Sequence, residues 1–252
     1  MGVLRQSCGL LRMRTAKNCL SQNNVIKETM QKQNIHKADT LTVEGNGKLP
    51  SPLVPIVNNI CVYCGSGDGR DPAYVGSAVT LGTAMAKAGI GLVYGGGSLG
   101  LMGKVARSVL DNGGRVTGII PAFLSNKERM LRDVNELIVV EDMHQRKRLM
   151  FEKSDAFVAL PGGVGTLEEL VEQLTWSQLG QHEKPIILAN INNFWNPLLA
   201  LLEHMRAERF IRQGLEVRFR VVDQASGILP AVVNAVAVSS DVGQAQHVPE
   251  RF

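Results

Sequence analysis

Apolar and polar positions follow two alternating patterns from residue 56 onward. Short apolar runs typical of buried strands stand at 59–63, 91–94, 116–120, 136–140, 156–160, 185–189 and 219–222. Between them, apolar residues recur at helical spacing, which predicts helices over roughly 72–88, 100–112, 143–153, 167–176, 195–212 and 225–237. Repeated strand–helix units with apolar strands predict an α/β fold: a Rossmann-like, doubly wound, mostly parallel sheet with helices on both faces.

The pattern also sets the expected domain boundaries. Residues 56–237 form a single domain, preceded by an extension over 1–55 and followed by a polar tail over 238–252. The extension has no acidic residue before Glu28. A disordered extension is the favoured interpretation; an arginine-rich targeting segment and an upstream mis-start stay open. The N-myristoylation pattern fails because the sixth residue is Gln6.

Charge is distributed unevenly along the 252 residues. The net charge is +4, but residues 1–50 hold eight Lys/Arg and three Asp/Glu, which leaves 19 basic and 20 acidic residues elsewhere. The predicted domain therefore gives no reason to expect nucleic-acid binding. No apolar run approaches the roughly 20 residues of a membrane span. Four cysteines make no disulfide framework at this length, so we expect a reducing, cytoplasmic compartment.

Three glycine-rich turns follow predicted strands. They are Gly65-Ser66-Gly67, Gly95-x-Gly97-x-x-Gly100 and Leu160-Pro161-Gly162-Gly163-Val164-Gly165-Thr166. Glycines at a strand-to-helix turn let backbone N–H groups approach an anion, and a helix N-terminus favours negative charge. The second turn matches the dinucleotide fingerprint but lacks an acid about 20 residues on, so we interpret it as a phosphate cradle rather than an NAD site. In parallel sheets such turns converge on one crevice.

Charged residues near these turns suggest chemistry. Glu168 and Glu169 are expected in the first turn of the helix after Thr166, where acids are also ordinary helix caps. In the helix capped by Asp142, the residues Met143, Arg146, Lys147 and Met150 share one face, while His144 and Arg148 point elsewhere. That face is either a solvated surface or a site for a phosphate or carboxylate. Cys61 and Cys64 lie on opposite faces of a strand, and the five histidines lack metal spacing, so no metal site is expected.

Several ordered motifs between about Ile60 and Val222 resemble the LOG ("Lonely guy") family. The main one is Pro161-Gly162-Gly163-x-Gly165-Thr166-x-x-Glu169, which resembles that family's PGGxGTxxE signature. The other motifs are Val62-Tyr63-Cys64-Gly65-Ser66, Val93-Tyr94-Gly95-Gly96-Gly97, Gly100-Leu101-Met102-Gly103, Met143-His144-x-Arg146-Lys147 and Thr175-Trp176-x-Gln178-Leu179-Gly180. Where the family often has Gly-Ser-Ser, Gly67 follows Ser66 here. LOG proteins are cytokinin riboside 5′-monophosphate phosphoribohydrolases, long mislabelled as lysine decarboxylases.

The resemblance implies an N-glycosidase acting on AMP or an N6-modified AMP, without a cofactor. It implies that Glu169 is the catalytic carboxylate and Arg146 its partner. It also implies a homodimer or larger homo-oligomer with the site near the subunit interface. The substrate-binding residues that it implies are Ser66, Gly96, Gly97, Glu128, Met143, Lys147, Gly162, Gly163, Val164, Gly165, Thr166 and Thr175.

Physical reasoning agrees with these roles in part. Thr166 and Glu169 are three residues apart and so share a helix face at the phosphate end. A carboxylate there stabilises oxocarbenium character on the ribose, and we expect Arg146 to keep Glu169 ionised. Pyridoxal phosphate would need a Schiff-base lysine, and neither Lys147 nor Lys184 has a suitable context. The alternative is a carrier of a nucleotide or molybdenum cofactor that uses the same crevice without cleavage.

Overall fold

The computed structural model describes residues 57–125 and 130–243. The predicted extension over 1–55 and Glu128 lie outside the described residues. The described chain begins at the first predicted strand and continues through the last predicted helix.

Seven strands form one sheet, in the order β4-β3-β2-β1-β5-β6-β7, and all six pairings are parallel. The strands are β1 Asn59–Tyr63, β2 Gly91–Tyr94, β3 Val116–Pro121, β4 Glu136–Val140, β5 Ala156–Ala159, β6 Ile186–Ala189 and β7 Arg220–Val222. The predicted fold class is confirmed, with one refinement in β3. Pro121 is the last residue of that strand rather than the residue that stops it, because a proline can end a strand where no further N–H is needed.

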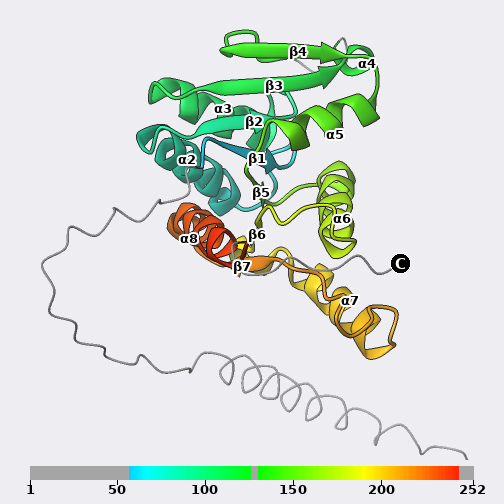
Figure 1. Cartoon of the computed structure of the whole chain (residues 1–252). Helices are drawn as coiled ribbons and strands as arrows, with labels where there is room; N and C mark the ends of the chain where they lie inside the picture. The colour runs from blue at the N-terminus through cyan, green and yellow to red at the C-terminus, as the bar shows by residue number, and fades with distance from the viewer. Residues whose placement is uncertain (1–56, 126–129, 244–252) are drawn as a thin grey trace, which may run out of the picture. The chain divides into compact units, whose positions relative to one another are not determined.

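Helices cover both faces of the sheet (Figure 1). Helices α2, α3 and α8 lie on one face, and α5, α6 and α7 lie on the other. Their bounds are α2 Pro72–Lys87, α3 Gly100–Asp111, α4 Ala122–Ser125, α5 Met143–Glu152, α6 Val164–Gln178, the 3₁₀ turn Ile191–Asn193, α7 Asn196–Ala207 and α8 Ala225–Gly243.

Four helices differ from the prediction, and one of them, α6, begins three residues early at Val164. The short α4 was not expected, because four residues are too few to show a periodicity. Helix α7 ends at Ala207, five residues early. Helix α8 continues to Gly243, into the segment expected to be a polar tail, because residues 238–242 contain neither glycine nor proline and polarity alone does not stop a helix.

The central strand β1 distributes its side chains to both layers of the core. Ile60 and Val62 pack with α2, α3 and α8, whereas Cys61 and Tyr63 pack with α5 and α6. This alternation is the period of two that a strand imposes. Cys64 follows on the first side, so the two thiols of the C-x-x-C point to opposite faces, as predicted, and both are free and buried. Among the described residues, no cluster of His, Cys, Asp and Glu could hold a metal ion.

The strand order reverses between β1 and β5. The chain proceeds outward from β1 through β2 and β3 to β4, then returns to place β5 on the other side of β1. Loops that follow β1 and β5 therefore diverge to opposite faces and leave a crevice at the carboxyl ends of these strands, which is where ligands bind in open parallel sheets. The first and third glycine-rich turns are these two loops.

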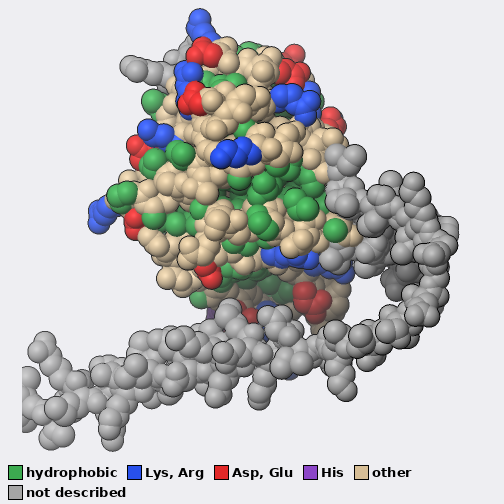
Figure 2. Space-filling model, turned by 90° about the vertical axis from the view of Figure 1, so that its left-hand side faces the viewer, with side chains coloured by type: hydrophobic (Ala, Val, Ile, Leu, Met, Phe, Trp, Pro, Cys, Tyr) green, Lys and Arg blue, Asp and Glu red, His purple; other side chains and the backbone are tan. Residues whose placement is uncertain are grey.

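The outer surface that Figure 2 displays is the side of the molecule where α2, α3 and α8 lie. Acidic and basic side chains are interspersed on it, and its described residues form no continuous basic patch. No helix in the described part of the chain is long and apolar enough to cross a membrane.

Candidate active site at the sheet's switch point

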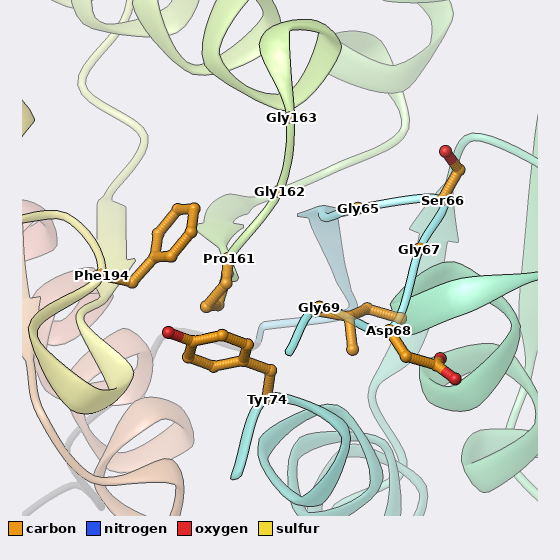
Figure 3. A pocket seen from close by; sticks show the side chains of 11 residues that line it. Gly65, Ser66, Gly67, Asp68, Gly69, Tyr74, Pro161, Gly162, Gly163 and Phe194 are labelled. Carbon is orange, nitrogen blue, oxygen red and sulfur yellow. The ribbon is translucent and has the colours of Figure 1, made fainter. Parts of the chain in front are cut away.

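A pocket of about 280 Å³ occupies the crevice between the loops after β1 and β5. Gly65, Ser66, Gly67, Asp68 and Gly69 line it from the first loop, and Pro161, Gly162 and Gly163 from the second. Tyr74, Leu101 and Phe194 complete the lining. Figure 3 shows the backbone from Pro161 to Gly163 running between the turn Gly65–Gly67 and the two aromatic rings.

Helix α6 begins at this pocket. Gly163 is its N-cap and has no side chain to cap the helix, so the amides of the first turn have no acceptor within the helix. Val164 and Gly165, the first two helical residues, are exposed. Thr166 is buried, and a Cβ added at Gly162 would stand 2.1 Å from its hydroxyl oxygen. The glycine at 162 therefore lets the threonine pack against the turn, and the helix N-terminus is left open to an anion.

The early start of α6 corrects the position of the two acids. Glu168 and Glu169 are the fifth and sixth residues of the helix, so they stand in its second turn and cannot cap it. Sequence reasoning placed the helix start too late, because Gly165 suggested that the turn was still continuing. The second-turn position directs Glu169 inward, where its side chain is only 9% exposed.

Two backbone amides in the first turn of α3, which follows the turn Gly95–Gly100, are already bonded. The N–H groups of Leu101 and Met102 donate to the carbonyl oxygens of Gly67 and Gly65, at 3.4 and 3.2 Å. The expectation of a second phosphate cradle was wrong for these donors, because the loop after β1 already occupies the helix N-terminus. Gly96 and Gly97 are buried and bond the segment at Met130 and Leu131.

Arg146, on α5, contacts the carboxylate of Glu169. Its Nη1 is 3.3 Å from Glu169 Oε1, and both side chains are about nine-tenths buried. Nε donates to the Ile119 carbonyl oxygen at 3.1 Å, and Nη2 donates to the Gly95 carbonyl oxygen at 3.4 Å. The guanidinium is therefore fixed by the ends of β2 and β3, as its planar fork of donors allows. A Cβ at Gly95 would stand 2.0 Å from Nη2, so this residue must be glycine for Arg146 to lie there.

Burial dominates the electrostatics of Glu169. It raises the pKa of this carboxyl to about 7, although the charge of Arg146 opposes the rise. Arg146 was expected to keep Glu169 ionised, and its charge does favour the ionised form. Burial has the larger effect, because removing the carboxylate from water costs more than the attraction of Arg146 returns. A carboxyl with a pKa near 7 can both accept and donate a proton at neutral pH, which suits general acid–base chemistry.

Lys147 lies beside Arg146 on α5 and is held by two other acids of α6. Its Nζ is 2.5 Å from Glu168 Oε1 and 3.0 Å from Glu172 Oε1. Burial alone would lower the pKa of Lys147, but the hydrogen bonds to these carboxylates raise it. Lys147 therefore stays charged and ties α5 to α6.

The other predicted site residues are dispersed. Ser66 is exposed at the pocket, and the Met143 sulfur lies 3.8 Å from Arg146 Nη1. Thr175 is exposed near the far end of α6, and its hydroxyl donates to the Val171 carbonyl oxygen at 2.8 Å. The α5 face itself was predicted correctly: Arg146, Lys147 and Met150 are buried, whereas His144 and Arg148 are exposed.

Sequence reasoning missed Tyr74 and Phe194 at the pocket. Tyr74 lies in the first turn of α2, and Phe194 follows the 3₁₀ turn after β6. No motif marks either residue. The only local signal is Asn192-Asn193, since asparagine tolerates the left-handed conformation that both residues adopt, with φ of 50° and 61°.

Comparisons with known proteins indicate the family to which the chain belongs. A sequence profile of the family described as "possible lysine decarboxylase" matches residues 102–232. A probable cytokinin riboside 5′-monophosphate phosphoribohydrolase of Oryza sativa subsp. japonica is 51% identical over 153 residues, covering 61% of this chain and 69% of the relative. An enzyme of Rhodococcoides fascians with the same activity in its name is 46% identical over 179 residues, covering 71% and 90%.

Solved structures show the same fold at lower identity. The molybdenum cofactor carrier protein of Chlamydomonas reinhardtii superposes with a TM-score of 0.54 at 23% identity, covering 72% of this chain and 98% of the carrier. A second structure, named TM1055, gives a TM-score of 0.56 at 20% identity. At these identities the likeness concerns the fold alone.

The fold and site together define a Rossmann-like α/β protein with an open helix N-terminus at the switch point and a buried carboxylate–arginine pair beside it. The chain belongs to the LOG family, whose members in the comparison carry the name cytokinin riboside 5′-monophosphate phosphoribohydrolase.

Proposed function

We propose that this protein hydrolyses the N-glycosidic bond of purine nucleoside 5′-monophosphates and releases the free base and ribose 5-phosphate. The observation that carries the proposal is Glu169, buried against Arg146 and one helical turn beyond Thr166 at the open end of α6. Relatives that are 46–51% identical are named for this reaction on cytokinin riboside monophosphates.

The N-terminus of α6 is the proposed site of the 5′-phosphate. The amides of Gly163, Val164, Gly165 and Thr166 would donate to its oxygens, and the helix dipole favours the negative charge there. Gly162 and Gly163 also line the pocket, so a phosphate bound at this turn has space to enter. A bound 5′-phosphate fixes the position of the ribose. The binding energy of the phosphate, which does not itself react, then helps to hold C1′ in place for the chemical step.

Glu169 is the proposed catalytic residue. As the C1′–N bond breaks, positive charge develops on the ribose, and an ionised carboxylate stabilises it. Water adds its oxygen to C1′, keeps one hydrogen as the new hydroxyl group and gives the other proton to Glu169. The departing base takes the electron pair of the broken C1′–N bond and receives the proton that Glu169 returns, directly or through solvent. The pKa of about 7 places Glu169 near the value at which it accepts and then returns a proton at neutral pH.

Arg146 is proposed to position Glu169. Its Nε and Nη2 donate to the Ile119 and Gly95 carbonyl oxygens, which fixes the guanidinium. Nη1 then contacts Oε1 of Glu169 and leaves Oε2 for the substrate or water. Gly96, Gly97, Glu128, Met143, Lys147 and Thr175 remain proposed contacts of the ribose or base, carried over from the family.

The family description suggests a lysine decarboxylase activity, but neither Lys147 nor Lys184 is placed to form the Schiff base that this activity needs. Lys147 bonds two carboxylates, and Lys184 Nζ donates to the Phe151 carbonyl oxygen at 2.7 Å. A Schiff-base lysine needs a neutral amine facing a cofactor pocket, and both of these amines have protein partners.

The proposed substrate is AMP or an AMP with an apolar N6 substituent. The direct test incubates purified protein with AMP and with isopentenyladenosine 5′-monophosphate and separates the free base by chromatography. Base release that is lost in Glu169→Ala and retained in Glu203→Ala, an exposed glutamate on α7, supports the proposal. Binding of both nucleotides without base release would contradict it and would favour a carrier role.

The proposed assembly is a homodimer that uses the outer face of α6. Val164, Leu167 and Val171 form an apolar stripe at helical spacing and are 83%, 37% and 41% exposed. An exposed apolar stripe on the helix that carries Glu169 favours contact with a second copy close to the site. Light scattering on Leu167→Glu, with Leu201→Glu on α7 as the matched control, tests this: only the former should yield a monomer.

A further inference from the structure

The pocket is closed at one end by two aromatic rings that no motif marks. Tyr74 and Phe194 pack edge to face, with ring centroids 5.7 Å apart and an interplanar angle of 77°. Both side chains are half-buried and both line the pocket. Figure 3 shows them on the side of Pro161 opposite to Ser66. We call this pair the aromatic wall.

Asp71 fixes the wall by holding the two segments that carry it. Its Oδ1 accepts from the Ala73 amide at 2.9 Å and so caps α2, the helix of Tyr74. Its Oδ2 accepts from the Asn192 side chain at 2.7 Å, two residues before Phe194. On the pocket side, Gly69 lies so close to the Tyr74 ring that a Cβ would stand 2.7 Å from Cδ2. The wall is therefore fixed on both sides.

The wall stands close to the proposed phosphate. Gly162 and Gly163 belong both to the pocket lining and to the turn at the start of α6. At about 280 Å³, the pocket is smaller than the roughly 300–1,000 Å³ typical of sites for whole small-molecule ligands, so it suits one end of a nucleotide.

The charges of the lining suit a single phosphate. The lining contains neither Lys nor Arg, and its one charged side chain is the carboxylate of Asp68. Arg70 follows the same turn, is exposed and does not belong to the lining. Proteins that bind a second or third phosphate supply cations for it. Here a β-phosphate would meet aromatic carbon at one end of the pocket and the residue that carries a like charge, Asp68, at the other (Figure 3). One helix N-terminus provides only about half a positive charge.

We propose that the aromatic wall of Tyr74 and Phe194, together with Asp68, restricts this site to nucleoside 5′-monophosphates by excluding a β-phosphate. The inference rests on the proposed function, because it takes the 5′-phosphate to bind at the start of α6. It assigns to these three side chains the selectivity for a monophosphate over a diphosphate. The glycine-rich turn cannot supply this selectivity, since its backbone amides can donate to the oxygens of either group.

The test measures base release from AMP and ADP by the wild-type chain and by Phe194→Leu, Tyr74→Ala and Asp68→Asn. The control is Phe210→Ala, an aromatic residue 84% exposed outside the pocket. We expect the ADP/AMP ratio of kcat/KM to rise about tenfold in each of the three variants, equivalent to ~1.4 kcal/mol, and to stay constant in the control. An unchanged ratio in all three variants overturns the proposal. Asp68→Asn changes an exposed side chain and keeps its shape, so it remains informative if a wall variant does not fold.

A binding measurement tests the aromatic-wall proposal separately from the hydrolase proposal. Calorimetric titration of the same proteins with AMP and ADP needs no turnover. If the wild-type chain binds AMP in preference to ADP but releases no base, the hydrolase proposal fails while the wall proposal stands. Equal binding of AMP and ADP by the wild-type chain, with base released from both, refutes the wall and leaves the hydrolase intact.

Discussion

Replacing Glu169 by glutamine should abolish activity and yet stabilise the protein above neutral pH. The pKa of this carboxyl is about 7 in the folded chain and near 4.5 when unfolded. The folded state therefore binds the proton more tightly, so its stabilising contribution is complete below pH 4.5 and is lost as the pH rises through 7. The difference of about 2.5 in pKa, at 1.36 kcal/mol each, makes ionisation of Glu169 cost about 3 kcal/mol by pH 8.

Glutamine has nearly the same shape and carries no charge, so it avoids this cost. The free energy of unfolding of Glu169→Gln relative to wild type should rise by about 2.5 kcal/mol between pH 5 and pH 8; this is less than the full difference because the unfolded carboxyl is already mostly ionised at pH 5. Arg146 keeps its bonds to the Ile119 and Gly95 carbonyl oxygens in the variant. The assay is urea denaturation of both proteins at pH 5, 6.5 and 8.

Comparing variant with wild type removes the contributions of other titrating groups. His182 is one of these, since burial lowers its pKa and gives it a pH dependence of opposite sign. Glu203→Gln serves as the control, because this glutamate is exposed and pairs only with Arg206 at the surface. A stability difference between Glu169→Gln and wild type that stays constant from pH 5 to pH 8 would refute the reasoning that Glu169 is buried with a raised pKa.

Three further outcomes follow from the same site. The kcat/KM for AMP should rise with pH through about 7 and then level off, because Glu169 acts in its ionised form and kcat/KM reports the pKa of the free protein; a profile that falls above pH 6 contradicts that role. Arg146→Lys should lower kcat/KM by roughly 100-fold or more, because an ammonium cannot reach two carbonyl oxygens and a carboxylate at once. The matched control is Arg148→Lys, exposed on the same helix, and equal losses in both would disprove the positioning role. Gly162→Ala should raise the KM for AMP, because its Cβ would stand 2.1 Å from the Thr166 hydroxyl. Gly76→Ala on α2, where a Cβ meets nothing within 4 Å, should leave the KM unchanged.

The pairing of Glu169 with Arg146 was predictable only as a possibility. Helical spacing placed Glu169 on the face of Thr166, and put Arg146 on one face of its own helix with Lys147. No local rule says that these two helices face each other across the ends of β2 and β3. The family signature suggested the pair, and the sheet order, which brings α5 and α6 to the same face, placed the two side chains 3.3 Å apart.

The protonation of Glu169 could not be predicted from sequence. Spacing shows which charges are near, and from nearness alone Arg146 should lower the pKa. Desolvation has the opposite sign and depends on how completely the neighbouring elements exclude water, which is a property of the packed structure. The same limit applies to Lys147, since its acceptor Glu172 became visible only when α5 and α6 were placed side by side.

The sequence by itself determined the strands, most helices and the glycine-rich turns at strand ends, because periodicity and backbone freedom are local properties. It also indicated a phosphate site at Gly163–Thr166 and a catalytic Glu169. Tertiary structure decided which turn has free amides, because only contact with the loop after β1 showed that the start of α3 is already occupied. It likewise decided that Tyr74 and Phe194 meet at one pocket: they are distant along the chain, and no local pattern relates residues that only the folding of the sheet brings together.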